Sequence, residues 1–292
     1  MKKILKFIPL FVLLCAFSRY LIIISISGKT AINESLQQEN KIYTDKKQNI
    51  KSIRIINENL QADYRGFGGG AVNPRSEMFF RFLNNSDFDV CAVQEMSLNW
   101  YSSIKEYKTS IKIVRPLLTS HFLIMTGIIY NSDTVTLLKS GDLKYSEGNV
   151  YFASHAVWGL FLQKSTNRKF IVISTHLNLI REKTAQRDLK EATSQAEELR
   201  SLIKQLCSKY QCSVIISGDF NSKEGEKIYL LLCKELNDCN ALCELKEKKK
   251  STDHIFLYPK GSVLNYRIIS GGEIKKMSDH RPVLTDILLD YE

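Results

Sequence analysis

Short runs of apolar residues recur along most of the chain, either alternating with polar residues or continuous. The runs are rich in β-branched and aromatic residues, and turn-forming residues bound them, which is typical of β-strands. "DVCAVQE" and "FIVISTHL" are continuous runs, whereas "SIRIINENL" alternates. The pattern predicts strands at residues 52–60, 89–95, 126–131, 134–140, 156–163, 170–177, 213–220, 254–259, 263–270 and 283–289.

Three segments have apolar residues at helical spacing instead. Residues 76–86 follow an Asn-Pro pair, and residues 226–236 form a short candidate helix. Residues 188–210 are rich in Glu, Lys, Ala and Leu and place several apolar side chains on one face. Many strands and few helices, without regular alternation, predict an α+β protein with two packed sheets and helices outside.

The first residues follow the pattern of an export segment. Two lysines precede an apolar stretch, and 16–18 and 25–27 both fit the small-x-small pattern of a cleavage site. Read as one piece, residues 7–26 could span a bilayer, which takes about 20 residues. We therefore expect residues 1–27 to be a cleaved signal peptide or an uncleaved signal-anchor. The protein would be exported, secreted or periplasmic, with membrane contact only through residues 7–26.

After this segment the chain is expected to fold as one domain. Residues 28–50 are polar and without periodicity, which is typical of a linker. No long Pro, Gly or Ser stretch interrupts residues 51–292, so we expect a single catalytic domain there, acting as a monomer. The Gly-rich stretch 64–75 is interpreted as a flexible turn.

The net charge indicates which classes of partner are favoured, and the spacing of the cysteines disfavours a zinc site. The formal net charge is +10, which favours nucleic acid, phosphorylated small molecules or anionic lipid, although a basic solvated surface explains it equally well. Lysines crowd residues 246–250, where they would attract polyanions at a site rim or simply be solvated. Apart from Cys15, six cysteines remain; they could be free thiols or form disulfides, and none has zinc-site spacing.

Polar residues stand where the predicted strands begin or end. Each is ordinary by itself, because Asn and Asp favour strand ends. Together they supply carboxylates, amides and imidazoles, the groups that bind a hard divalent cation through oxygen and move protons at a phosphate. The set consists of Asn59, Glu95, His176, Asp219, Asn221, Asp253, Asp279 and His280.

The order and wording of these segments resemble the endonuclease/exonuclease/phosphatase superfamily, to which deoxyribonuclease I belongs. The matching segments are "IINENLQ", "DVCAVQE", "STHL", "SGDFNS", "TDHIF" and "SDHRPV", spread over residues 51–289. The resemblance implies a four-layer α/β/β/α sandwich of two mostly antiparallel sheets, with the site at one end of the sheets. It also implies metal-dependent hydrolysis of phosphoester bonds.

The resemblance implies roles for the individual residues. Asn59, Glu95 and Asp279 would lie at the metal, which is expected to be Mg²⁺, with Ca²⁺ or Mn²⁺ as alternatives. His176, Asp219, Asn221, Asp253 and His280 would be catalytic: Asp219 and Asn221 orient the water and bind phosphate, and Asp253 orients His280. We expect a nuclease acting on DNA or RNA; the alternative is a phosphoesterase acting on lipid or inositol phosphates. A non-catalytic binding protein is disfavoured, because every expected site residue is present.

Overall fold

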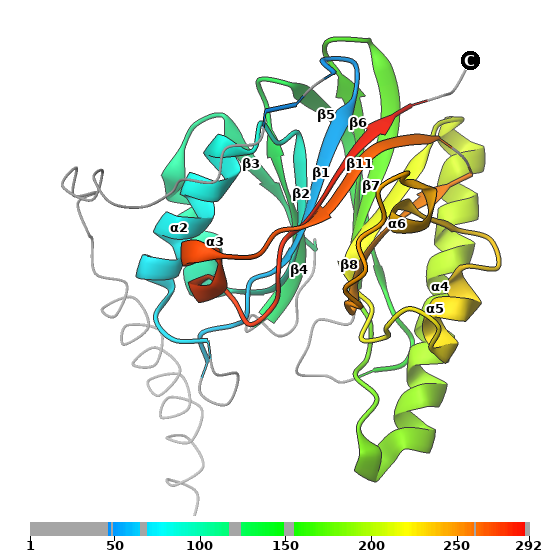
Figure 1. Cartoon of the computed structure of the whole chain (residues 1–292). Helices are drawn as coiled ribbons and strands as arrows, with labels where there is room; N and C mark the ends of the chain where they lie inside the picture. Colours follow the sequence, from blue (N-terminus) through cyan, green and yellow to red (C-terminus); the bar gives the residue numbers. More distant parts are fainter. Residues whose placement is uncertain are drawn as a thin grey trace, which may run out of the picture. The chain divides into compact units, whose positions relative to one another are not determined.

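Two six-stranded sheets form the centre of the protein in the computed structural model, which describes residues 46–47, 49–64, 69–116, 124–148, 155–259 and 261–289 (Figure 1). The described residues belong to the unit Asn40–Glu292, so the expected export segment 1–27 lies outside them. Sheet A holds, in spatial order, β11 (Ser262–Ile268), β12 (Val283–Leu288), β1 (Ile53–Asn59), β2 (Val90–Ser97), β4 (Ile124–Asn131) and β3 (Ile111–Val114). Sheet B holds β5 (Val135–Lys144), β6 (His155–Gln163), β7 (Arg168–His176), β8 (Val214–Asp219), β10 (Asp253–Tyr258) and β9 (Asn237–Asp238).

Helices cover the outer face of each sheet (Figure 1). On sheet A lie α2 (Val72–Asn85), α3 (Leu98–Tyr107) and the 3₁₀ turn η3 (Gly272–Lys276). On sheet B lie α4 (Ala185–Tyr210), preceded by the 3₁₀ turn η2 (Glu182–Thr184), and α5 (Lys227–Leu232). The short helix α6 (Cys239–Leu242) packs against β9, β10 and β11.

Both sheets share one arrangement of strands. In sheet A the only parallel pair is β1 with β2, and in sheet B it is β7 with β8; every other pairing among the described strands is antiparallel. Parallel neighbours need a crossover connection, and here α2 and α4 provide it. The carboxyl ends of two adjacent strands therefore meet at one edge of each sheet.

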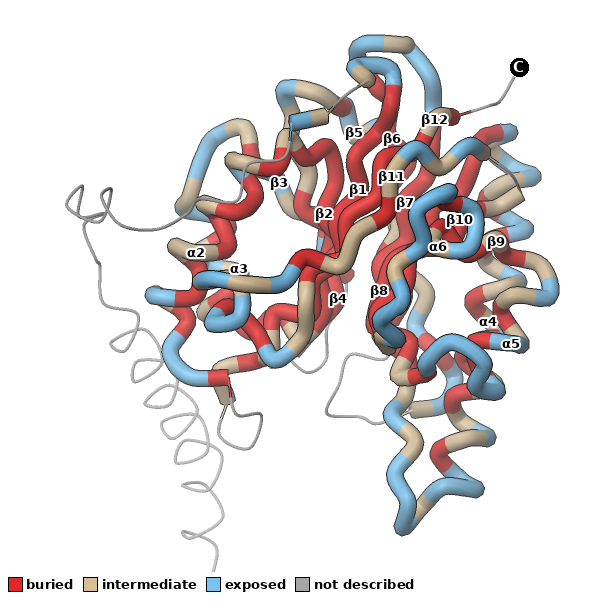
Figure 2. The backbone as a smooth tube through the Cα atoms, in the orientation of Figure 1, coloured by how far each residue is buried: buried red, intermediate tan, exposed pale blue. Residues whose placement is uncertain are grey.

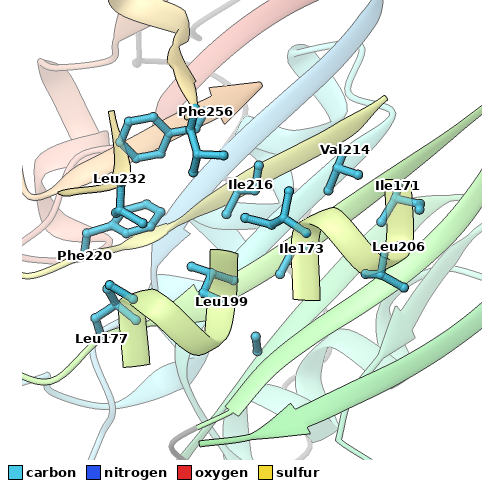
Figure 3. Close-up of a cluster of buried hydrophobic side chains, with 14 of the residues drawn as sticks. Ile171, Ile173, Leu177, Leu199, Leu206, Val214, Ile216, Phe220, Leu232 and Phe256 are labelled. Carbon is cyan, nitrogen blue, oxygen red and sulfur yellow. The ribbon is translucent and has the colours of Figure 1, made fainter. Parts of the chain in front are cut away.

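Three apolar layers separate the four layers of secondary structure. One lies between α2 and α3 and sheet A, and includes Phe79 and Trp100. A second lies between the two sheets. The third lies between sheet B and α4, where Leu199 meets Ile173 and Ile216 (Figure 3). Burial is accordingly concentrated in the strands and the inner faces of the helices (Figure 2). This confirms the predicted four-layer sandwich.

The structure adds elements that the apolar pattern did not predict. Helix α3 is one; its N-cap Ser97 accepts a hydrogen bond from the backbone of Trp100, and its mixed aromatic and polar sequence resembles a strand continuation. The edge strands β3 and β9 were not predicted either, because strands of such length leave little pattern, and neither were the short helix α6 and the 3₁₀ turns η2 and η3. Helix α2 begins at Val72, earlier than expected, so the end of the Gly-rich stretch 64–75 is helix and not turn.

The six described cysteines are free thiols, which settles the alternative left open by their spacing. Burial raises the pKa of Cys91 and Cys239 well above the usual range, so both side chains act as small apolar groups. In the described part of the chain, no helix has the length and hydropathy needed to cross a bilayer.

A buried ion pair ties β1 to β12 at the amino end of β1. Arg54 is 0% exposed, and its Nε and Nη2 donate to the two carboxylate oxygens of Asp286 at 2.7 Å each. Arg54 also donates through Nη1 to the carbonyl of Ser86 at 2.8 Å, next to the end of α2. The guanidinium therefore joins a helix and two strands through directed bonds.

Candidate active site

The carboxyl ends of β1, β2, β7 and β8 meet at one end of the sandwich, and four expected site residues lie there. Asn59 ends β1, Glu95 lies near the end of β2, His176 ends β7 and Asp219 ends β8. Sheet A thus contributes the amide at the end of β1 and the carboxylate of β2, and sheet B contributes the imidazole at the end of β7 and the carboxylate of β8.

The side chain of Asn59, at the end of β1 in sheet A, hydrogen-bonds to a site residue of each sheet. Its Nδ2 donates to Glu95 Oε1 at 3.1 Å and to Asp219 Oδ2 at 3.2 Å, and lies 3.5 Å from His280 Nε2. The second oxygen of Glu95 accepts from the backbone of Ala62 at 3.1 Å. Two carboxylates from different sheets therefore converge on a single atom.

Two of the site residues have backbone conformations that ordinary residues avoid. Glu95 has φ 51°, where the register of β2 against β4 shifts between Val93 and Met96, and Asn221 has φ 47°. The left-handed region costs a residue with a Cβ atom roughly 1 kcal/mol or more, and Asn tolerates it better than Glu. A β-bulge with this turn directs the Glu95 carboxylate out of the regular strand and toward Asn59.

His280 and Asp253 form a directed pair. His280 Nδ1 lies 2.7 Å from Asp253 Oδ2, and His280 Nε2 is left facing Asp219 Oδ2 at 3.7 Å. Burial lowers the pKa of His280, but the hydrogen bond to Asp253 and the nearby carboxylates outweigh burial and raise it to about 10. Burial likewise raises the pKa of Asp253, and the positive charge of His280 counteracts it. At neutral pH we therefore interpret the pair as an imidazolium with a carboxylate.

The variant Asp253→Asn is expected to lower the pKa of His280 from about 10 to about 6.5 or below. Because the pKa of His280 is raised in the folded state, its contribution to stability is complete below about pH 6.5, the unfolded value, and is lost as pH rises through about 10. The loss of unfolding free energy in the variant should thus be largest in that acidic range. NMR titration of His280 in the metal-free protein measures this, and a wild-type pKa near 6.5 would contradict the assignment.

His176 and Asn221 form the opposite side of the site. His176 Nε2 lies 3.4 Å from Asp219 Oδ2 and 3.0 Å from Asn221 Nδ2. Asn221 is held in place, because its Nδ2 donates to the carbonyl of Leu177 at 2.8 Å and its backbone N–H donates to Asp219 Oδ1 at 2.9 Å. Asp219 therefore lies between the two histidines, His176 and His280.

A buried polar network lies one step behind these residues, between the sheets. Asn57 Nδ2 donates to Asp253 Oδ1 at 3.1 Å, while Asn57 Oδ1 accepts from Gln94 Nε2 at 3.0 Å and from Ser217 Oγ at 2.9 Å. Gln94 Nε2 also donates to Ser174 Oγ at 3.2 Å. Sequence reasoning missed these residues, although Asn57, Ser174 and Ser217 each stand two positions before a site residue.

The variant Asn57→Ala is expected to lower kcat by about 10- to 100-fold, the usual range for a residue that orients a catalytic group. Asp253 would lose one of the bonds that fix it, and His280 would lose its orientation. KM should change little, because Asn57 is buried and does not reach the substrate. Steady-state kinetics with a small phosphodiester measure kcat and KM separately. Asn57→Asp, which adds a buried charge, serves as a more disruptive comparison.

The remaining expected residue, Asp279, lies at the margin of the site. Two other polar side chains of neighbouring segments, His254 and Arg75, lie outside it. Asp279 is exposed, and its Oδ1 accepts from Ser278 Oγ at 3.3 Å, so its side chain is not among the groups gathered around Asn59. His254 packs against the ring of Tyr229 on the other face of β10 and bonds to the carbonyl of Ser222. Arg75 donates to five backbone carbonyls, and its guanidinium lies over the ring of Trp100, which makes it a structural cation.

The donor set fits a hard divalent cation. The carboxylate oxygens of Glu95 and Asp219 converge on the amide of Asn59, which faces them with Nδ2 while its Oδ1 accepts from the backbone of Gln61, and no cysteine lies among these groups. Asp219, Asp253 and His280 also lie close enough together to share an ion, but the short bond between His280 Nδ1 and Asp253 already uses two of those groups. Glu95 and Asp219 are therefore the carboxylates that we assign to a bound metal, with Asn59 beside them, because these two negative charges face only the one imidazolium of His280.

No protein-family sequence model matches the chain, and no curated protein matches it in sequence. Solved structures do match. An endonuclease/exonuclease/phosphatase family protein of Bacteroides thetaiotaomicron is 21% identical with a TM-score of 0.69, over 82% of this chain and 99% of that chain. The mannosyl-6-phosphatase Bt3783 of the same organism is 20% identical with a TM-score of 0.68, over 81% and 99%.

A third similar structure is that of Danio rerio TDP2 complexed with single-strand DNA product, at 15% identity and a TM-score of 0.62, covering 81% of this chain and 98% of that chain. Identities at this level establish the shared architecture. The chain therefore has the endonuclease/exonuclease/phosphatase fold, as the resemblance of its motifs implied.

Proposed function

We propose that this protein is a divalent-metal-dependent hydrolase of phosphoester bonds that acts principally on nucleic acid. The observation that carries the proposal is the convergence of Asn59, Glu95, Asp219 and His280 at one point between the sheets. Such a group can neutralise a phosphate, orient a water and supply a proton, which together are the requirements of phosphoester hydrolysis.

His280 would bind the substrate as an imidazolium. With a pKa of about 10 it carries a proton on Nε2 at neutral pH, and it cannot then serve as the resting general base. Asp253 holds Nδ1, so the Nε2–H is directed at Asp219 and at whatever lies beside it. We infer that this N–H donates to a non-bridging phosphate oxygen and stabilises the charge that develops there.

Asp219 and its neighbours would handle the water and the leaving group. Asp219 is the carboxylate between the two histidines, so it is placed to orient a water and accept its proton. Asn221 fixes Asp219 through its backbone N–H and contacts His176 through its side chain. His176 then donates to the leaving oxygen. A divalent ion bound by Glu95 and Asn59 would neutralise the phosphate and favour the leaving group.

Nucleic acid is favoured over other phosphoesters by charge. The net charge of +10 favours a polyanion, and TDP2 is a protein of this fold that was crystallised with a DNA product. The mannosyl-6-phosphatase of the same fold makes a phosphomonoester the second candidate. We also propose, from the N-terminal sequence alone, that the protein is exported, and we keep the expectation that its catalytic domain acts as a monomer.

A substrate panel tests the proposal. The full chain is incubated with plasmid DNA, RNA, mannose 6-phosphate, sphingomyelin and phosphoinositides, each with Mg²⁺, Ca²⁺, Mn²⁺ or EDTA. We expect cleavage of DNA or RNA that EDTA abolishes. Hydrolysis of a monoester or a lipid with intact nucleic acid would overturn the substrate, and no hydrolysis of any phosphoester would overturn the enzyme.

A further inference from the structure

Two runs of exposed lysines lead directly into the two residues of the His280–Asp253 pair. The first lysine run, Lys246 with Lys248, Lys249 and Lys250, precedes Asp253 at the start of β10. The second lysine run, Lys275 and Lys276 in η3, precedes the Ser278–His280 segment. One run therefore approaches the pair from sheet B and the other from sheet A.

Among the residues that the structure describes, the lysines of both runs have no ionic partner, although carboxylates are close by in the sequence. No ion pair within the described residues involves any of the six. In the second run, Glu273 is engaged by Arg81 at 3.0 Å instead. In the first, Glu247 Oε1 accepts from the backbone of Ile268 at 3.3 Å. The ammonium groups are therefore available to an anion from outside.

The first run is not a loose tail, because hydrogen bonds hold its segment at both ends. Glu247 exchanges two bonds with the side chain of Asn240, at 2.8 and 3.0 Å. At the other end, the carbonyl of Thr252 accepts from the backbone of Phe220 at 2.9 Å. Phe220 stands between Asp219 and Asn221, so the lysine segment is fastened to the centre of the site.

We propose that the two lysine runs bind non-scissile phosphates of a polynucleotide on the His280 side of the site. This inference rests on the proposed function and specifies its substrate: a chain of regularly spaced phosphates, not a single phosphoester. A monoester bound at His280 has no further phosphate to place on either run. A polynucleotide has one at every nucleotide, and lysine neutralises such phosphates as a point charge.

The contacts would read the backbone and not the bases. Among the described residues, every exposed large hydrophobic side chain is Leu or Ile, and none is aromatic. The described residues therefore offer no aromatic ring of the fully exposed class to the bases, and we expect binding to depend on salt and not on base sequence. Leu242 and Leu245 are exposed beside the first run, so an anionic membrane is the competing partner that the test must separate.

The test compares two triple variants of the full chain. Lys248→Gln/Lys249→Gln/Lys250→Gln removes three charges of the first run. Lys105→Gln/Lys108→Gln/Lys112→Gln removes three exposed charges at α3 and β3, and serves as the matched control. For each, kcat/KM on an oligonucleotide duplex is measured over a range of salt concentrations, and kcat/KM on bis(p-nitrophenyl) phosphate is measured beside it.

We expect the first variant to flatten the slope of log kcat/KM against log salt for the duplex by about 2 to 3, since each phosphate contact contributes roughly 0.9. Its activity on bis(p-nitrophenyl) phosphate should match the wild type, and the control should keep the wild-type slope. Equal slopes in both variants, with active enzyme, would overturn the lysine assignment and leave the proposed function standing. Inactivity of the wild type on both substrates would instead overturn the proposed function.

Binding to vesicles of phosphatidylcholine, with and without phosphatidylserine, distinguishes nucleic acid from an anionic membrane as the partner of the first lysine run. We expect the first variant and the control to bind both kinds of vesicle equally, because the first run is assigned to nucleic acid. Loss of binding to the anionic vesicles in the first variant alone, with an unchanged slope on the duplex, would assign the run to a membrane and overturn the proposal.

Discussion

The variant His280→Ala is expected to lower kcat for phosphodiester hydrolysis by about 10²- to 10⁴-fold, the usual contribution of a positioned acid or base. The variant loses the imidazolium that faces Asp219 and the phosphate. It also leaves Asp253 buried without its charged partner, so some stability is lost as well. Rates are measured by single turnover on a short oligonucleotide, with circular dichroism to show that the fold persists.

A second substitution separates chemistry from folding. His280→Gln can still donate to Asp253 but carries no charge, so it should be more stable than His280→Ala and equally slow. Added imidazole should restore part of the rate of His280→Ala only, because only that variant has room for it. Turnover near the wild-type rate in either variant would remove His280 from the mechanism.

Asp286→Ala is expected to reduce the free energy of unfolding by about 3–5 kcal/mol, because it leaves the buried guanidinium of Arg54 without its carboxylate. The pair lies at the amino end of β1, and Asn59 lies at the other end. Urea denaturation should therefore show a lower midpoint, while kcat of the still-folded protein stays at the wild-type value.

An exposed ion pair of the same chemistry provides the control. Arg81 and Glu273 lie 3.0 Å apart with about a third of each side chain exposed, and Glu273→Ala should cost about 0–1 kcal/mol. Replacing both partners, with Arg54→Met and Asp286→Leu, should recover much of the loss caused by Asp286→Ala. Equal midpoints for Asp286→Ala and Glu273→Ala would show that burial of the Arg54 pair has no special energetic importance.

The apolar pattern indicated candidate site residues at strand ends but not the residues that hold them in place. Asn59, His176 and Asp219 stand at the ends of apolar runs, where a polar residue is easily seen. Asn57, Ser174 and Ser217 lie inside the runs and were interpreted as part of the strands. Residues two apart in a strand point to the same face, so a polar residue two positions before each site residue was the available signal for the buried network.

Other features depend on pairings that a single sequence does not contain. Arg54 stands in the apolar segment "SIRIINENL", and only the pairing of β1 with β12 brings Asp286 opposite it. The left-handed turn at Glu95 depends on a bulge between β2 and β4, and no glycine or asparagine within β2 indicates it. Gly127 lies opposite Val93 at the bulge, but only the pairing of the two strands shows this. The parallel pairs β1–β2 and β7–β8 likewise follow from crossovers, and the apolar runs alone suit either direction.

The pairing of β1 with β12 has a consequence for the order in which the protein can become active. Among the described strands, β1 is synthesised first and its antiparallel neighbour β12 last, just after His280. At roughly 5–20 residues per second, the ribosome takes on the order of 10–45 s to travel between them. Until β12 has been synthesised, sheet A is incomplete and β1 lacks its antiparallel neighbour. Assembly of the candidate site therefore waits for the segment that contains His280 and β12.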